Sequence, residues 1–409
     1  MFQLDLIQTV ALAGIFLFVG HLLCKVIKPL GRYNIPAPVV GGLLIALFNL
    51  ITHQYGIEIL KFDTTLREPL MIAFFTTMGL NASLSLLKVG GPAVLKFFFI
   101  ATFFAVAQNV VGIIAASPFG VSPLLGVLSG SVTLTGGPAT GLAFAPLFQQ
   151  KGVDGAATIA VAAAMAGIIS GGLIGGPVGT YLIKKYKLKT HRHESEKNIS
   201  SEHLIEEFNK DKSSKKGWIA GEDIQYIYML KSIVVILASM WIGSGLSLLF
   251  KSWGLTLPAY IGAMMIAGII RNTDDKTKLF NLPHHTINQF GDIALSLFIV
   301  IALMTLNLWK LADLALPLIT ILLVQIIMIS LVCLWPIFHL MGKDYEAAVI
   351  STGFLGFMLG TTANSMANMK VLSDKYGPAP KAFLIVPIVG AFFIDFTNAI
   401  IITMFLNFY

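Results

Sequence analysis

The sequence predicts an all-α polytopic membrane protein: two inverted repeats of five transmembrane helices, each with a re-entrant hairpin. Three observations lead to this prediction. First, 56% of the 409 residues are hydrophobic and only 12% are charged, whereas about 25% are charged in a soluble domain. Second, the apolar runs are long and unbroken, which indicates helices because barrel strands alternate apolar and polar residues. Third, polar, glycine-rich stretches at residues 130–141 and 353–368 interrupt the apolar pattern in each half.

Ten apolar segments are expected to cross the membrane. They lie near residues 5–27, 37–52, 67–84, 93–116 and 156–183, and near residues 224–250, 257–271, 288–308, 314–340 and 381–408. A crossing needs about 20 residues, so the short segments 37–52 and 257–271 are expected to extend into their flanks or to be broken. The first segment is longer than the apolar part of a signal peptide and its lysines follow it, so we interpret it as a retained helix.

A polar linker divides the chain into a first repeat at 1–183 and a second at 224–409. Residues 184–223 contain the charged runs Lys184-Lys-Tyr-Lys-Leu-Lys189 and Lys210-Asp-Lys-Ser-Ser-Lys-Lys216. Such runs are expected to lie in solvent. Cytoplasmic loops carry an excess of lysine and arginine, so the linker is expected in the cytoplasm and both termini outside. The net charge of +7 follows from these loops and does not indicate a nucleic-acid partner.

The two glycine-rich stretches predict re-entrant hairpins near 122–148 and 345–370. Backbone that leaves helical geometry at membrane depth survives only where protein buries it or where it lines a wet cavity. Broken helices in corresponding positions of two halves are the best sequence indication of a transporter's central site. Close packing by small residues is the alternative interpretation. The candidate substrate-binding residues are Thr133, Thr135, Gly136, Gly137, Thr140 and Gly141 at the first tip and Gly360, Thr361, Thr362, Asn364 and Asn368 at the second.

Weak internal similarity supports the repeat. Ile35-Pro-Ala-Pro-Val-Val-Gly-Gly42 resembles Leu257-Pro-Ala-Tyr-Ile-Gly262, and the pairs Gly137/Gly360 and Gly167/Gly390 both have a spacing of 223 residues. An odd number of crossings per repeat inverts the second copy, which is the arrangement of many secondary transporters.

Asp395 is the strongest single candidate for binding a cation. It lies well inside the last apolar segment, where a charged side chain costs at least ~2.5 kcal/mol on insertion scales. Asn398 and Thr397 add neutral oxygen atoms one turn or less away, so the three residues form a candidate sodium site. The alternative is a carboxyl group that hydrogen-bonds to another helix. Gln108, Asn109 and Gln325 are polar residues within apolar runs, for which interhelical hydrogen bonding and site lining remain equally open.

The sequence contains none of the enzymatic motifs considered. There is no P-loop, no zinc-binding HExxH pattern and no nucleophile elbow, and the two cysteines do not have metal-ligand spacing. We therefore expect no cofactor other than a coupling ion. Without an ATP-binding motif, transport is either driven by a gradient or passive.

The chain resembles the bacterial sodium/glutamate symporters, the glutamate:sodium symporter family, nearly end to end. The resemblance rests on 35–44 (IPAPVVGGLL), 66–75 (LREPLMIAFF), 126–134 (GVLSGSVTL), 171–177 (GGLIGGP) and 386–395 (VPIVGAFFID). It implies a homodimer in the bacterial inner membrane, surrounded by lipid, that uses sodium to take up glutamate or a related anionic amino acid.

The chain departs from the family pattern at both hairpin tips. Pro138 and Ala139 stand where members have His and Gly, and Ala363 and Asn364 stand where they have Pro and Thr. The exact substrate is therefore open. A proton-coupled transporter of another organic solute remains an alternative, as does a passive channel, although the sequence lacks the rings of charge that channels use.

Overall fold

The computed structural model describes residues 2–56, 59–85, 91–189, 221–253, 257–306, 308–309 and 314–409. Most of the predicted linker, residues 190–220, lies outside these ranges.

The first half contains helices at the five expected crossings and at the expected hairpin, with several short additions. The elements are β1 (Phe2–Gln3), α1 (Leu6–Val26), α2 (Lys28–Arg32), α3 (Ala37–Gln54), β2 (Leu60–Lys61), α4 (Arg67–Asn81), α6 (Gly91–Ala116), η1 (Ser117–Phe119), α7 (Pro123–Val127), η2 (Leu128–Val132), α8 (Gly137–Gln150) and α9 (Ala156–Lys185). Local sequence sets several boundaries: Asp5 and Gln8 form a capping box at α1, and Pro36 precedes α3. Strands β1 and β2 pair in parallel.

The main helices of the second half follow a similar order. Its elements are α11 (Gly221–Ser252), α12 (Ala259–Thr277), α13 (His284–Met304), α14 (Ala315–Val332), η5 (Cys333–Ile337), α15 (Phe338–Leu340), α16 (Tyr345–Met358), α17 (Thr362–Tyr376), α18 (Pro380–Ile388), η6 (Val389–Phe393) and α19 (Ile394–Phe408). Helices α3, α6, α7 and α9 begin at residues 37, 91, 123 and 156, and α12, α14, α16 and α18 begin at 259, 315, 345 and 380. The similar offsets mean that the main helices follow one another at similar spacings in each half.

Seven helical stretches of the described chain are long and apolar enough to cross a membrane. They are Leu6–Val26, Ala37–Gln54, Gly91–Phe119, Ala156–Lys185, Tyr226–Ser252, His284–Met304 and Ala315–Leu340. The other three expected crossings are also helical, but α4 has 15 residues, α12 carries charges at its end, and residues 380–408 are divided by the π-helix η6. Their crossing of the membrane stays a prediction.

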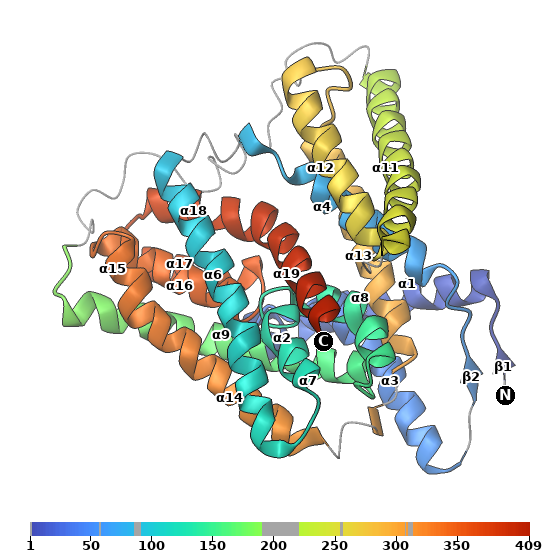
Figure 1. Cartoon of the computed structure of the whole chain (residues 1–409), viewed down its shortest axis with the longest axis horizontal. Helices are drawn as coiled ribbons and strands as arrows, with labels where there is room; N and C mark the ends of the chain where they lie inside the picture. The colour runs from blue at the N-terminus through green and yellow to red at the C-terminus, as the bar shows by residue number, and fades with distance from the viewer. Residues whose placement is uncertain are drawn as a thin grey trace.

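The helices pack in two groups, visible on opposite sides of Figure 1. The flank group consists of α1, α3, α4, α11, α12 and α13, and the hairpin group consists of α6 to α9 and α14 to α19. Each half contributes its first helices to the flank group and its remaining helices, with the broken segments, to the hairpin group.

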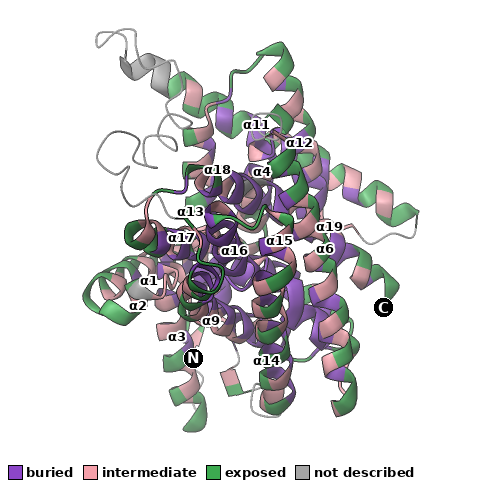
Figure 2. Cartoon of the chain, turned by 90° about the vertical axis from the view of Figure 1, so that its left-hand side faces the viewer, coloured by how far each residue is buried: buried purple, intermediate pink, exposed green. Residues whose placement is uncertain are grey.

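The hairpin group holds the most deeply buried elements. All residues of α16 except Glu346 are buried, as Figure 2 shows for the purple centre of the molecule. By contrast, α1 and α14 expose large apolar side chains such as Phe18 and Leu331 on the surface. A helix that is apolar all round suits a protein interior, and exposed apolar faces suit lipid.

Close backbone contact joins the first two long helices of each half. A Cβ atom added at Gly20 of α1 would lie 2.2 Å from the Ala37 carbonyl oxygen of α3. A Cβ atom added at Gly243 of α11 would lie 2.2 Å from the Ala263 Cα of α12. Glycine is needed at both crossings because no side chain fits between the helices.

Candidate functional site

The first hairpin tip is a break between η2 and α8. Gly130 has non-helical backbone angles, φ −100° and ψ −128°, and the chain then turns through residues 133–136 before α8 begins at Gly137. Gly137 has φ +68°, a left-handed conformation that favours glycine. The Asn109 side chain of α6 holds the break by accepting a 2.9 Å hydrogen bond from the Ser131 N–H.

The second tip is the short extended segment between α16 and α17. Thr361 is extended, with φ −146° and ψ 162°, and its hydroxyl accepts a hydrogen bond from the Asn364 N–H at 3.4 Å. Thr361 is thus the N-cap of α17, a role for which threonine is well suited.

The two tips meet. A Cβ atom added at Gly137 would lie 3.5 Å from the Gly360 carbonyl oxygen and 3.9 Å from Thr361 Cγ2. Helices α8 and α17 both begin at this contact, so two positive helix ends come together. Such ends attract carboxylates.

Among the first-tip candidates, Thr140 stands apart from the other threonines. Thr133 donates to the Leu128 carbonyl at 2.7 Å, and Thr135 donates to Gln108 Oε1 at 2.6 Å. Thr140 is 4% exposed, and its hydroxyl has no hydrogen bond to any described residue. It is therefore the hydroxyl at this tip that is available to a ligand.

The remaining first-tip candidates shape the tip rather than present polar groups. A Cβ atom added at Gly136 would lie 2.6 Å from Thr140 Cβ, and one added at Gly141 would lie 2.9 Å from Ala160 Cβ. Pro138 and Ala139 are buried in the first turn of α8. Proline, which lacks an N–H group, is tolerated there because an N–H at this position would have no partner within the helix.

The second-tip candidates are largely engaged with the protein. Thr362 donates to the Gly390 carbonyl of η6 at 2.9 Å. Asn364 donates to the Ile168 carbonyl at 2.8 Å and accepts from Asn34 Nδ2 at 3.2 Å. Asn368 donates to the Gly171 carbonyl at 3.0 Å. Both asparagines thus position α17 against α9, whereas Ala363 is exposed.

The glycines of α9 make these contacts with α17 possible. A Cβ atom added at Gly167 would lie 2.3 Å from the Leu359 carbonyl oxygen, and one added at Gly175 would lie 2.1 Å from Asn368 Nδ2. The small residues of α9 therefore serve close packing, one of the two interpretations given to small residues in the sequence.

The candidate sodium ligands differ in their surroundings. Asp395 is partly buried, and its carboxylate has neither a hydrogen bond nor an ion pair with any described residue. Asn398 is fully buried; its Nδ2 donates to the Ser131 carbonyl at 2.8 Å, while its Oδ1 has no partner. The Thr397 hydroxyl donates to the Phe393 and Ile394 carbonyls of its own helix.

Further buried polar atoms without partners surround the first break. They include the hydroxyls of Ser129 and Ser131, the Asn109 amide nitrogen and Gln325 Oε1. A buried polar group without a partner costs about 1–3 kcal/mol. Several within one region indicate a place for a bound polar species. Sequence reasoning missed Ser129, Ser131 and Asn34; small polar residues next to Gly130 and the Ile35-Pro-Ala-Pro motif were the only signals.

Gln108 connects both hairpins. Its Nε2 donates to the Met358 carbonyl at the end of α16 at 2.8 Å, and its Oε1 accepts from Thr135. The Gln325 side chain of α14 donates in turn to the Gln108 carbonyl. The polar residues of α6 and α14 thus hold the hairpins through interhelical hydrogen bonds.

The chain is similar to known proteins over almost its whole length. The profile of the family described as "Sodium/glutamate symporter" matches residues 2–378. The sodium/glutamate symporter of Escherichia coli K12 is 38% identical over 410 aligned positions, which cover 99% of this chain and 98% of that protein. The Haemophilus influenzae sodium/glutamate symporter is 38% identical and covers 96% of this chain and 95% of its own. These alignments show that the chain belongs to the sodium/glutamate symporter family and is a transporter rather than an enzyme.

Proposed function

We propose that this protein is a sodium-coupled symporter that carries glutamate, or a closely related anionic amino acid, across the bacterial inner membrane. The observation that carries the proposal is the contact between the two hairpin tips, where α8 and α17 direct their N-termini at one place. The named relatives are sodium/glutamate symporters, which supports sodium as the coupling ion and glutamate as the substrate.

The substrate is proposed to bind between the tips. The positive N-terminal ends of α8 and α17 suit a substrate carboxylate, and the Thr140 hydroxyl, which has no hydrogen bond to any described residue, can donate to it. Gly137 and Gly360 allow the backbone to approach closely. Asn364 and Asn368 act through the position of α17, and Thr361 caps that helix.

Sodium is proposed to bind where α19 meets the first break. The Asn398 Oδ1 and Ser131 Oγ atoms are buried and unpartnered, and the Asn398 amide is held against Ser131. Asp395 lies three residues, just under one turn, before Asn398 and supplies the negative charge. Oxygen ligands of this kind suit a hard cation. Thr397 can contribute only by accepting, because its hydrogen is directed at its own helix.

We further propose the membrane arrangement that the sequence indicates. The repeated order of elements supports two repeats, and five crossings in each would make them inverted and both hairpins re-entrant. The lysine and arginine distribution supports a cytoplasmic linker and external termini. The family resemblance supports a homodimer.

Uptake of labelled glutamate into proteoliposomes tests the proposal. Inward sodium, potassium and proton gradients are imposed separately, and unlabelled aspartate and glutamine are added as competitors. Accumulation above the equilibrium level with the sodium gradient alone is expected. Accumulation driven only by protons would instead support a proton-coupled transporter. Equilibration without accumulation would support a passive channel.

A further inference from the structure

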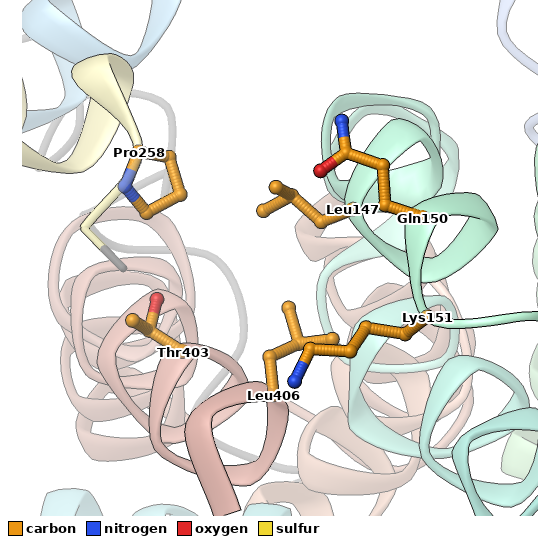
Figure 3. A pocket seen from close by; sticks show the side chains of 6 residues that line it. All are labelled: Leu147, Gln150, Lys151, Pro258, Thr403 and Leu406. Atoms are coloured by element: carbon orange, nitrogen blue, oxygen red, sulfur yellow. The ribbon is translucent and has the colours of Figure 1, made fainter. Parts of the chain in front are cut away.

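Two adjoining cavities lie at the seam between the flank group and the hairpin group. Their volumes are about 380 and 220 Å³, and they share Leu147, Gln150 and Pro258. The walls come from the N-terminal ends of α4 and α12 and from the C-terminal ends of α8 and α19. Figure 3 shows the smaller cavity, with Lys151 extending from the end of α8 towards α19. The larger one has the size of a small-molecule site, for which about 300–1,000 Å³ is usual.

The larger cavity contains an arginine without a carboxylate partner. Arg67 is partly buried, and its Nη2 donates to the Leu142 carbonyl at 3.3 Å. Within the described part of the chain it forms no ion pair. A guanidinium group presents five donors in a fork that matches a carboxylate, so most of its hydrogen-bonding capacity is free.

A second unsatisfied group lines the same cavity. Tyr260 is 3% exposed, and its hydroxyl has no hydrogen-bond partner. Its ring is fixed by Phe75 and Phe144, at centroid distances of 4.8 and 5.2 Å. A buried tyrosine hydroxyl normally has a partner, so the hydroxyl of this cavity-lining residue has its hydrogen-bonding capacity free for a ligand that reaches it.

The charges around the two cavities match those of a dicarboxylic amino acid. Arg67 and Glu68 line the larger cavity and Lys151 lines the smaller. Two cations and one anion complement two carboxylates and one ammonium group. The net charge of the set, +1, is opposite to that of glutamate at neutral pH.

We propose that this seam cavity is a capture site, where an anionic amino acid binds before it reaches the hairpin tips. Arg67 binds one carboxylate, the Tyr260 hydroxyl adds a hydrogen bond, and Glu68 is available to the ammonium group. The inference rests on the proposed function for the identity of the substrate. All four element ends that line the cavity are external in the proposed topology.

The position of the cavity along α8 supports this role. Arg67 contacts Leu142, five residues after Gly137 at the tip, which is about 7.5 Å along a helix. Ala143 also lines the larger cavity, whereas Gln150 and Lys151 lie at the far end of α8. The cavity thus follows α8 from its exposed end to within two turns of the tip.

Substitution of Arg67 and Tyr260, with Lys61 as the matched control, tests the capture site. Initial rates of sodium-driven glutamate uptake are measured over a range of glutamate concentrations. Arg67→Gln is expected to raise the KM roughly tenfold or more, and Tyr260→Phe about threefold to tenfold, with the maximal rate within about twofold of the unsubstituted protein. Arg67→Lys keeps the charge and should recover part of the loss. Lys61 is exposed on β2 outside both cavities, so Lys61→Gln should leave the KM unchanged.

The result that would overturn the capture site is an unchanged KM in both Arg67→Gln and Tyr260→Phe. A lower maximal rate at constant KM would also overturn it, because Arg67 would then serve only the position of α8. Failure of the proposed function can be distinguished from failure of the capture site, because the unsubstituted protein would then show no sodium-driven uptake. In that case, calorimetric titration of the purified protein with glutamate tests the cavity directly. Weaker binding by Arg67→Gln supports the site and equal binding overturns it.

Discussion

Replacing Thr140 by valine should weaken glutamate binding without destabilising the protein. The two side chains have nearly the same shape, and the Thr140 hydroxyl has no hydrogen bond to any described residue. Valine therefore removes no hydrogen bond within the described part of the protein. A hydrogen bond to a charged carboxylate contributes about 1.5–3 kcal/mol to the complex. Its loss corresponds to a roughly 10- to 150-fold rise in the dissociation constant.

Two measurements on the same preparation separate these effects. Glutamate binding to purified Thr140→Val is measured calorimetrically in saturating sodium, and the thermal midpoint is measured without substrate. Thr352→Val is the matched control, because Thr352 is also buried in a helix but donates to the Val349 carbonyl of its own helix at 2.8 Å. That variant should keep its affinity for glutamate. Unchanged affinity in Thr140→Val, or an equal loss in both variants, would refute binding at the first tip.

Four further outcomes are expected. Asp395→Asn should raise the sodium concentration for half-maximal uptake at least tenfold while expression stays normal, because the carboxylate has no structural partner; an unchanged sodium dependence would exclude Asp395 from the site. Gly137→Val should abolish uptake, because a β-branched residue at φ +68° is strained and its side chain would enter the tip contact; near-normal uptake would contradict that contact. Converting Pro138 to His and Asn364 to Thr should shift competition towards glutamate, and no shift would show that the tips do not set specificity. A cysteine introduced at Ser213, in a variant without the native cysteines, should not react with an impermeant thiol reagent in intact cells, because the linker is expected in the cytoplasm. Labelling would place the linker outside.

Hydropathy predicted the long apolar helices, and the glycine- and threonine-rich composition predicted the two breaks. The predicted spans 93–116 and 156–183 correspond to α6 (Gly91–Ala116) and α9 (Ala156–Lys185), because long apolar runs admit one structure in lipid. The breaks were predictable because glycine and threonine are conspicuous there. The predicted hairpin ranges 122–148 and 345–370 contain both tips, at residues 133–136 and 359–361.

The partners of individual polar side chains could not be predicted. Asn364 resembled a ligand-binding residue in the sequence, yet Ile168 and Asn34 occupy its amide. Asn34 lies 330 residues away from it, and only the tertiary fold brings them together. The seam cavity has the same origin, since its walls come from four elements whose ends meet only after packing.

The hydrogen bonds that hold the tips also determine when the site can assemble during synthesis. The contact of α1 with α3 is complete once the first 54 residues have emerged, whereas the tip bonds join residues 196 to 330 positions apart. Contacts of such separation form late, because the intervening chain must be closed first. A nascent chain released before α17 therefore contains the first hairpin with polar atoms that have no partner in the bilayer. Substitutions at Asn364 or Gln108 should for this reason lower the yield of inserted protein more than the thermal midpoint of the molecules that complete folding.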